Sequence, residues 1–436
     1  MVQEPDHSRR DIVKASAAVA GLGSAAIAGC TGNGNGNGNG NGNGNGNGNG
    51  EMEMPNEVSV PGLYDLSGVT SFVGIPTSLG SRDAIKYINE NDVLPTDIDH
   101  EWTDYSYEVP QANQAYEKYT QDSDPPAIIG WGTSDTQALG PKVARDEIVY
   151  VSASYSEKLL SNDTPYNFFG NLDYASQMRC LLKWVNENDP GASIGYVAPN
   201  APSGNDPVEP LDQYAESIGL DFRLPPLYMD LGASTAESQV KRARDQELDY
   251  VLHNAIAPTV NVLLRSIDEF YPELKTLTYT WGVDENFLAQ TPDLYENVTW
   301  VNGFKSWGEV MSEDTRGSRA VQESFDQYRE DGAMDDPAKA NLHYPRGFIH
   351  TLLVVRATQN AAEMGLDITD GSNLREGFFA IDDWDVWGLA QPFSYQEGDR
   401  RPTMNGRIYQ VSDGALEYDQ TIELPRNQSW IEYWNE

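Results

Sequence analysis

Short apolar runs alternate with amphipathic helical segments along most of the chain. One stretch shows the pattern clearly. Ala127–Ile129 is an apolar run typical of a buried strand, and after the polar loop Gly130–Ser134 apolar side chains recur at the helical period up to Ala144. Ile148–Val151 is a second apolar run. Residues 127–155 therefore predict a strand–loop–helix–strand unit, which is the building block of a parallel sheet covered by helices.

The same alternation repeats in two series with a break near Gly170, which predicts an α/β fold with two similar lobes. A hairpin over Asp413-Gly414 is expected near the C-terminus, at residues 407–418. The other expected strands are 58–64, 102–107, 168–169, 194–198, 222–224, 251–254 and 277–280, and the other expected helices are 76–91, 111–121, 174–188, 211–218, 237–244, 259–270, 316–329 and 344–364.

The N-terminal segment has the features of an export signal. Ser8–Lys14 resembles a twin-arginine signal, Ala15–Ala28 is weakly apolar and too short to span a bilayer comfortably, and Ile27–Cys30 resembles a lipobox. We therefore expect residues 1–30 to be a twin-arginine-type lipoprotein signal with Cys30 lipidated; the alternative is a chance cysteine. A dinucleotide-like glycine pattern in this segment has no strand before it and is discarded.

Nine Asn-Gly pairs occupy residues 33–50. Asn and Gly bury too little apolar surface to offset the entropy of ordering a chain, so residues 31–56 are expected to be a disordered tether. Eighteen such residues span about 25 Å on average.

The formal net charge is −38, with acidic residues spread evenly along the chain. Even acidity is typical of a surface that stays hydrated at molar salt, where screening removes self-repulsion. We interpret it as a halophilic, haloarchaeal type of protein; the alternative is a specific cationic partner. A nucleic-acid partner is disfavoured because phosphate contacts need a basic surface.

Cysteines and sequons add little. Cys180 lies in an apolar helical stretch and is expected to be a buried small hydrophobe, and no disulfide is expected in the mature chain if Cys30 is lipidated. Asn162, Asn297 and Asn427 begin glycosylation sequons, whose use the sequence does not decide.

The catalytic motifs of common hydrolases and metalloproteases are absent from the sequence. His343 and His350 stand two helical turns apart without a third candidate metal ligand nearby, and carboxylate pairs such as Asp383 and Asp385 are expected by chance at this acidity. We therefore predict no enzyme, no metal and no cofactor.

Hydroxyl groups follow both strands of the 127–155 unit. Thr133 and Ser134 follow the first strand, and Ser152, Ser154 and Tyr155 end the second. Ligands of open parallel sheets bind at the carboxyl ends of strands, and the N–H groups at a helix N-terminus favour an anion. This is the chemistry of a carboxylate receptor.

Four segments in order resemble the type I periplasmic binding-protein family, in the branch that binds branched-chain and other hydrophobic amino acids for ABC importers. They are LYDLSGVTSFVG, IIGWGTSDTQALGPKVARDEIVYVSAS, GFIHTLLVVRATQNAAEMG and GRIYQVSDGALE. The resemblance covers nearly the whole mature chain. It implies two Rossmann-like lobes with parallel sheets, joined by a three-strand hinge with the ligand in the cleft. Lobe one is then 57–170 plus 304–400, and lobe two is 171–303 plus 401–436.

The resemblance also implies a ligand-binding set. Thr133, Ser134, Ala153, Ser154 and Tyr155 match positions that hold the ligand carboxylate, although Ser and Thr also cap helices and turns everywhere. The remaining candidates are Asp65 and Ser67 in the first loop, Trp131 and Phe72 as apolar walls or core packing, Ser203, His253, Trp281 and Asp284.

The sequence departs from the family after the strand that ends at Thr280. Trp281 stands where the amino acid binders place an acidic residue for the ligand ammonium, with Asp284 three residues on and Asp65 as another source of charge. An ammonium without a charged partner is costly to bury. Trp281 could instead hold a cation over its ring or stack on an aromatic or sugar-like ligand. Ser203 replaces a common tyrosine, and His253 falls where an aromatic residue is frequent.

The function that the resemblance implies is a lipid-anchored receptor on the extracellular face of the cell membrane. It would capture a small carboxylate-bearing ligand, first of all a branched-chain or other hydrophobic amino acid, and deliver it to ABC permease and ATPase subunits. The alternatives are a non-amino-acid ligand, such as an aromatic acid, an amide or a sugar-like molecule, and a sensory role. The sequence leaves the ligand, the open or closed state and the oligomer undecided.

Overall fold

The computed structural model describes residues 54–329, 341–412 and 414–435. The expected signal at 1–30 with Cys30, and nearly all of the expected tether at 31–56, lie outside these residues, as does Asp413 of the expected hairpin turn. The described residues from Met54 onward belong to one compact unit.

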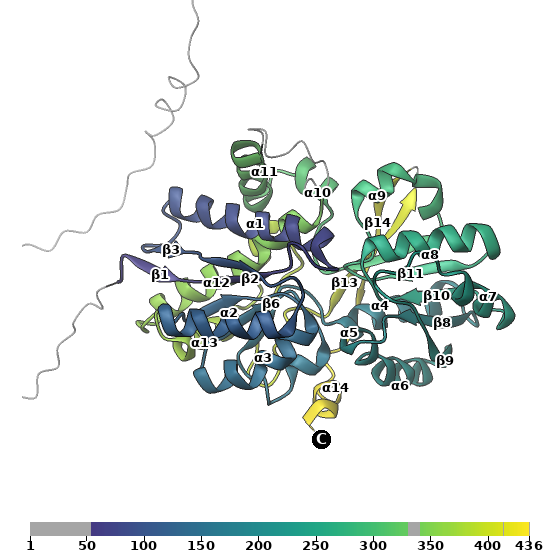
Figure 1. The fold of residues 1–436 in the computed structure, drawn as a ribbon, viewed down its shortest axis with the longest axis horizontal. Helices are drawn as coiled ribbons and strands as arrows, with labels where there is room; N and C mark the ends of the chain where they lie inside the picture. The colour runs from purple at the N-terminus through teal and green to yellow at the C-terminus, as the bar shows by residue number, and fades with distance from the viewer. Residues whose placement is uncertain (1–53, 330–340, 413, 436) are drawn as a thin grey trace, which may run out of the picture. The chain divides into compact units, whose positions relative to one another are not determined.

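Five short strands form a parallel sheet in the first lobe, in the order β4-β2-β5-β6-β7. Figure 1 labels β2 and β6 of this sheet. All three residues of β5 and all four of β6 are buried, because the sheet is covered by helices on both faces. The strands are β2 (Gly62–Tyr64), β4 (Trp102–Asp104), β5 (Ala127–Ile129), β6 (Val149–Ser152) and β7 (Asn167–Phe169).

The helices of this lobe come from distant parts of the chain. They are α1 (Ser71–Glu90), α2 (Val109–Asp122), α3 (Thr133–Asp146), α11 (Arg316–Arg329), α12 (His343–Glu363) and α13 (Gly371–Phe379). α1 and α12 approach so closely that a Cβ on Gly80 would lie 2.0 Å from the Tyr344 carbonyl oxygen. The helix expected from Pro76 begins five residues earlier, at Ser71, because Gly74 lets the extra turn pack against the Asp65 backbone.

A seven-stranded sheet forms the second lobe, in the order β14-β13-β12-β11-β10-β8-β9. The first five strands in the chain pair in parallel, whereas the C-terminal hairpin adds two antiparallel strands at one edge. They are β8 (Ser193–Ala198), β9 (Asp221–Tyr228), β10 (Tyr250–His253), β11 (Lys275–Thr278), β12 (Val298–Asn302), β13 (Asn405–Ser412) and β14 (Ala415–Glu423). The hairpin is confirmed and is longer than predicted, whereas β12 was not predicted.

Helices cover this second sheet as well: α4 (Tyr174–Asn188), α6 (Val208–Ile218), α7 (Glu237–Asp245) and α8 (Ala257–Phe270), with the shorter α5 (Pro202–Asn205) and α9 (Glu285–Gln290). Asp173 caps α4 through Ser176 N–H, which explains why this helix begins where the pattern predicted. Cys180 on α4 is buried and unpaired, as expected.

The predicted α/β fold with two lobes of dominantly parallel sheets is confirmed. The chain passes between the sheets at residues 170–173, 303–306 and 400–404. The first two passages meet in a buried network, where the Asn171 amide donates to Thr280 Oγ1 at 3.0 Å and to Asn302 Oδ1 at 2.9 Å.

The remaining elements are small: the β1 (Glu57–Ser59) and β3 (Asp97–Asp99) pair, α10 (Trp307–Ser312) and α14 (Ser429–Glu432). Within the described part of the chain, no helix combines the length and apolar character needed to cross a bilayer.

Candidate functional site

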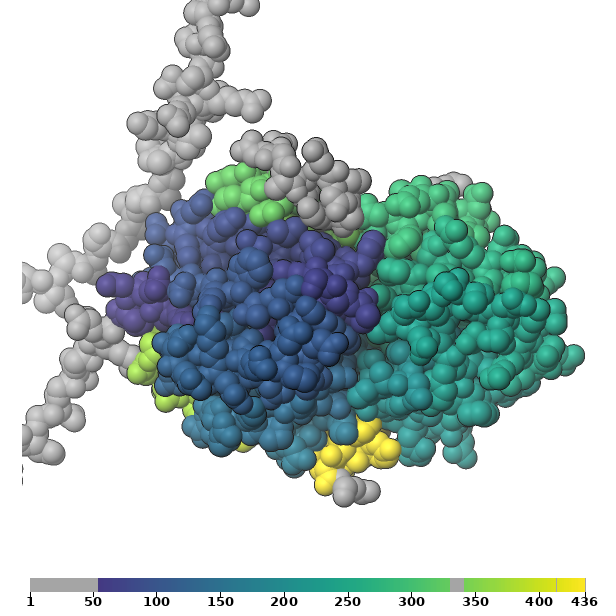
Figure 2. Space-filling view, in the orientation of Figure 1, coloured from purple at the N-terminus to yellow at the C-terminus, as the bar shows by residue number. Residues whose placement is uncertain are grey.

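A cavity lies between the two lobes, which meet along a seam between blue and teal residues in Figure 2. Its empty volume, including the part open to solvent, is about 440 Å³. That size suits a small molecule. Most of its wall follows directly after strands of both sheets, as expected for open α/β sheets. The lining residues are Thr70, Val73, Tyr107, Trp131, Gly132, Thr133 and Ala153 from the first lobe, Pro199, Ser203, Leu231, Asn254, Ala255, Ile256, Tyr279 and Trp281 from the second, and Tyr174 at the start of α4.

Thr133 begins α3 at the edge of the cavity. Ser154 Oγ donates a hydrogen bond to Thr133 Oγ1 at 2.9 Å, so the Thr133 hydroxyl proton is not used in that bond. The hydroxyl and the partial positive charge of the helix N-terminus together favour a negatively charged group.

A buried carboxyl group, that of Asp135, orders the loop at the N-terminus of α3. Asp135 accepts hydrogen bonds from the Tyr105 hydroxyl at 2.9 Å and from Gly132 N–H at 3.2 Å. Burial raises the pKa of Asp135 to about 7, although these bonds favour its charged form. Asp135 does not line the cavity, so it shapes the loop rather than facing a ligand.

Asp65 has the corresponding role at the start of α1. Its two carboxylate oxygens accept from Gly68 N–H at 2.5 Å, Thr70 N–H at 2.8 Å and the Thr70 hydroxyl at 2.6 Å. Asp65 is fully buried and does not line the cavity. The structure therefore differs from the expectation that Asp65 offers a charge to the ligand, because backbone donors already occupy its oxygens.

Two tryptophans from opposite lobes form the aromatic part of the wall. The Trp131 and Trp281 ring centroids lie 5.6 Å apart at an interplanar angle of 65°. Trp131 Nε1 donates to Thr70 Oγ1 at 2.9 Å and Trp281 Nε1 donates to the Tyr174 hydroxyl at 3.2 Å. Because their N–H groups are satisfied by the protein, the tryptophans offer the cavity apolar surface.

Arg346 of α12 lies against Trp281 and was not anticipated as part of this region. Its guanidinium carbon is 3.7 Å from the Trp281 ring centroid, and its N–H groups donate to Thr280 O at 3.0 Å and Thr280 Oγ1 at 3.1 Å. The side chain is fully buried and forms no ion pair with any carboxylate in the described residues. The structure thus differs from the idea that Trp281 holds a ligand cation, because Arg346 already covers a face of the ring.

The second-lobe wall carries an amide with a fixed orientation. Asn254 Nδ2 donates to the Tyr196 hydroxyl at 2.7 Å and to the Ser203 carbonyl oxygen at 2.8 Å. A carbonyl oxygen can only accept, so Nδ2 must face Ser203. Asn254 Oδ1 is buried and has no hydrogen-bond partner among the described residues, which makes it an unsatisfied acceptor on a residue of the cavity wall.

His253 and Asp284 lie outside the cavity wall. Both are fully buried. Burial lowers the pKa of His253 to about 3, so the ring is neutral. Asp284 caps α9 through Asn286 N–H at 2.8 Å, and burial raises its pKa to about 7. Asp284 is therefore a helix cap rather than an ammonium partner, contrary to expectation.

The lobes also contact each other at two places outside the cavity wall. Asp206 of the second lobe accepts hydrogen bonds from Gln137 of α3 at 2.7 Å and from the Ser156 hydroxyl at 2.6 Å. Elsewhere the Phe72 and Phe287 rings pack with centroids 5.0 Å apart. These contacts describe a closed arrangement of the two lobes.

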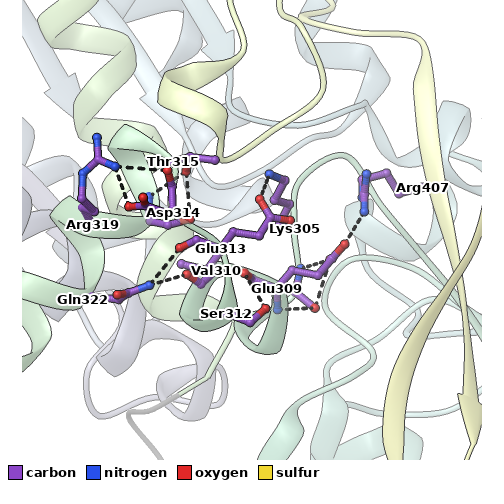
Figure 3. A network of polar contacts seen from close by, with 12 residues as sticks. Lys305, Glu309, Val310, Ser312, Glu313, Asp314, Thr315, Arg319, Gln322 and Arg407 are labelled. Carbon is purple, nitrogen blue, oxygen red and sulfur yellow. Dashed lines mark hydrogen bonds and ion pairs between the residues drawn. The ribbon is translucent and has the colours of Figure 1, made fainter.

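A polar network fastens the second passage between the lobes (Figure 3). Glu309 of α10 pairs with Arg407 of β13 and accepts a hydrogen bond from the Tyr409 hydroxyl at 2.7 Å. Lys305 pairs with Glu313 on the other side of α10. The network connects the passage at 303–306 to β13 of the second sheet.

Some of the ligand-binding residues predicted from the sequence lie together at the cavity. Trp131, Thr133, Ala153, Ser203 and Trp281 line the cavity. Ser154 stands behind Thr133, Tyr155 is buried and stacks on Trp281 with centroids 6.0 Å apart, and Phe72 packs between the lobes. Outside the wall are Asp65, Ser67, Ser134, His253 and Asp284, of which Ser67 is exposed and bonded to Ser106.

Sequence reasoning missed Tyr107, Tyr174, Asn254 and Tyr279 on the wall. Three of them follow a strand end within one to three residues, which is a signal that would have found them. Tyr174 follows the first passage between lobes and opens α4.

In residues 54–329, 341–412 and 414–435, no group of three or more His, Cys, Asp or Glu side chains is placed to hold a metal ion. His350 is buried with a pKa lowered to about 3, and burial lowers that of His343 well below its ordinary range. The cavity thus offers hydroxyls, an amide and aromatic rings, which can bind a ligand.

Comparison with known proteins gives a consistent result. A family model described as "Periplasmic binding protein" matches residues 57–415, whereas no curated protein matches the chain. Among solved structures, the chain is similar to an ABC transporter substrate-binding protein from Aeropyrum pernix, with 26% identity, a TM-score of 0.77, and coverage of 87% of this chain and 99% of that one.

Two further structures share the fold at lower identity. A branched-chain amino acid ABC transporter protein from Thermus thermophilus with bound valine has 18% identity, a TM-score of 0.77, and coverage of 87% of this chain and 99% of that chain. A fatty acid ABC transporter substrate-binding protein from Thermomonospora curvata has 17% identity, a TM-score of 0.73, and coverage of 88% and 96% respectively.

Proposed function

Because this chain belongs to the periplasmic binding protein family, we propose that it captures a small carboxylate-bearing ligand with a hydrophobic tail and delivers it to an ABC importer. The observation that carries the proposal is the cavity between the lobes, which is lined by residues after the strand ends of both sheets. Relatives of similar fold are described as binding valine or fatty acids, both of which carry a carboxylate.

The mechanism follows from the two lobes. Thr133, supported by Ser154, donates to the carboxylate at the α3 N-terminus, while Trp131 and Trp281 enclose the tail. A ligand favours the closed arrangement only through the contacts it adds with the second lobe. Closure removes the ligand from water and presents one surface, formed by both lobes, to a permease.

A thermal and scattering experiment tests the proposal. Leucine, phenylalanine, 4-methylpentanoate and 3-phenylpropanoate are added separately to the protein in molar KCl. Ligand at a hundred times its Kd stabilises a fold by about 2.7 kcal/mol, so at least one of them should raise the melting temperature by a few degrees and reduce the radius of gyration. If none of the four does either, the protein is not a receptor for hydrophobic carboxylates.

Thr133→Val keeps the shape of the side chain and removes the hydroxyl donor. A lost hydrogen bond to a charged group costs about 1.5–3 kcal/mol, so the affinity for the responsive ligand should fall by about tenfold or more in titration calorimetry. Thr120→Val on the outer face of α2 is the matched control, since its hydroxyl bonds only to Glu117 of the same helix. Equal affinities of the two variants would contradict the role of Thr133.

We also propose, from the sequence, that the mature protein is held at the extracellular face of the membrane by a lipid on Cys30, with residues 31–56 as the tether. One acyl chain binds a membrane only marginally, so the anchor should carry two chains. Cys30→Ser should move the protein from the membrane fraction to the medium, whereas Cys180→Ser, at a buried position, should leave it with the membrane. Retention of the Cys30→Ser protein in the membrane fraction would contradict the anchor.

A further inference from the structure

The described wall of the cavity contains no Asp, Glu, Lys, Arg or His side chain. A charged group on a ligand loses its hydration when the lobes close, and this loss must be offset by groups of the wall. The question is therefore which charge the uncharged wall can accommodate.

The first-lobe end of the cavity accommodates a negative charge. α3 begins at this end, with Thr133 on the wall, whereas the first N–H groups of α1 and α4 are already bonded within the protein. Helix N-termini carry partial positive charge and free N–H groups. The Thr133 hydroxyl adds a donor, because its oxygen already accepts from Ser154.

The second-lobe end offers neutral groups. Asn254 Oδ1 is a buried acceptor without a partner among the described residues, and its orientation is fixed by Tyr196 and the Ser203 carbonyl. Tyr279 also lines the wall and packs against Tyr174, with ring centroids 5.2 Å apart. One amide oxygen and aromatic faces suit a hydroxyl or an apolar tail, but they do not neutralise an ammonium.

The buried guanidinium of Arg346, next to the cavity wall, also favours an anionic ligand over a cationic one. Arg346 lies on Trp281 with no carboxylate partner in the described residues, so its positive charge is separated from the cavity by one indole ring. At low effective dielectric this charge attracts an anion and repels a cation in the cavity.

The buried carboxyl groups next to the wall do not reach the cavity. Asp65 and Asp135 turn their oxygens toward their own loop N–H groups and hydroxyls, away from the cavity. Asp173 caps α4 through Ser176 N–H and is not part of the wall either. None of the three can touch a ligand ammonium in this arrangement.

We infer that the cavity selects a small monocarboxylate with a branched or aromatic tail and no cationic group, and that it discriminates against the corresponding α-amino acid. This inference rests on the proposed function and names the ligand class of the same site. The geometry that carries it is the α3 N-terminus with the Thr133 hydroxyl, on a wall without charged side chains and next to the buried Arg346.

Calorimetric titration in molar KCl of matched ligand pairs tests the inference. We expect 4-methylpentanoate to bind at least tenfold more tightly than leucine, and 3-phenylpropanoate at least tenfold more tightly than phenylalanine. Tighter or equal binding of the amino acids would overturn the inference and leave the proposed function standing. Tighter binding of 4-methylpentanamide than of 4-methylpentanoate would overturn the assignment of an anion. Binding of none of these compounds would instead contradict the proposed function itself.

An isosteric substitution reverses the expected preference. Asn254→Asp places a carboxylate on the second-lobe wall, so leucine should gain at least tenfold in affinity relative to 4-methylpentanoate. Asn297→Asp is the matched control, because it adds the same charge at an exposed loop residue before β12. An unchanged ratio in a folded Asn254→Asp protein would overturn the inference, and the wild-type pairs decide it if that variant does not fold.

Discussion

At the scale of single residues, several buried carboxyl groups cap helices and loops at positions where the sequence suggests contacts with a ligand. Asp65, Asp135, Asp173 and Asp284 are each at least nearly fully buried, and each accepts backbone N–H groups at the start of a helix or loop. Three of them have pKa values raised by burial, to about 7, 6 and 7 for Asp135, Asp173 and Asp284. Such a group lowers stability once its proton is lost.

Asp284→Asn should make the protein less sensitive to pH. The folded protein keeps the Asp284 proton up to about pH 7, whereas the unfolded chain loses it near 3.8. Between these values the stability falls as pH rises, by about 1.4 kcal/mol per pH unit for each proton involved, and above pH 7 the loss is complete. The variant should therefore gain stability relative to wild type from pH 4.5 to pH 7.5 in chemical denaturation.

The titratable neighbours of Asp284 are the same in the wild-type protein and in the Asp284→Asn variant. Buried His343 has its pKa lowered well below the ordinary range, and Glu285 has its pKa raised by burial, but both are present in wild type and variant. Asp293→Asn, at an exposed position of the next turn, is the control and should leave the pH profile unchanged. Parallel curves for Asp284→Asn and wild type would contradict the interpretation.

At the scale of elements, the cavity is the place where helix starts and strand ends of both lobes meet. α3 is involved twice, because Thr133 at its first turn lines the cavity and Gln137 one turn later bonds to Asp206 of the second lobe. The same Asp206 oxygen accepts from Ser156 after β6. The element that would contact a ligand carboxylate therefore also joins the lobes.

Asp206→Ala should weaken ligand binding without unfolding either lobe. Removal of the two hydrogen bonds to its carboxylate lowers the population of the closed arrangement. The closed arrangement loses about 1.5 kcal/mol or more of stabilisation, so the Kd should rise by about tenfold. Calorimetry measures the Kd, and solution scattering should show a larger radius of gyration. Asp212→Ala, exposed on α6, is the control; an Asp206→Ala protein that binds as tightly as the control would show that this contact does not favour closure.

At the scale of the whole molecule, the net charge of −38 dominates the behaviour in solution. Most of the ion pairs in the described residues involve exposed side chains and contribute little each, so they do not compensate an excess of this size. Self-repulsion destabilises the folded state at low ionic strength and is screened at high salt.

The melting temperature should consequently rise steeply between dilute buffer and molar KCl. A calorimetric or fluorescence melt at increasing KCl measures it. A melting temperature in dilute buffer as high as in molar KCl would contradict the halophilic interpretation.

The sequence determined the fold class through local patterning. Short apolar runs such as β5 and β6 are typical of covered parallel strands, and a cap followed by regular periodicity defined α4. It also located Trp131, Thr133 and Ala153 near a strand end, where open sheets place their ligands. The missed strand β12, with all five residues buried, shows the limit of the same rule, since Thr299 and Asn302 interrupt its apolar run.

Only the tertiary structure decided which polar residues face the cavity. A carboxylate after a strand can bind a ligand or cap a loop, and both roles use the same acceptor chemistry, so Asp65 and Asp284 could not be assigned from the chain alone. Arg346 reaches Thr280 across 66 residues of sequence, and its position on Trp281 follows from how α12 packs, not from any local pattern. Local propensity acts over a few residues, whereas the charge around the cavity is set by contacts between distant segments.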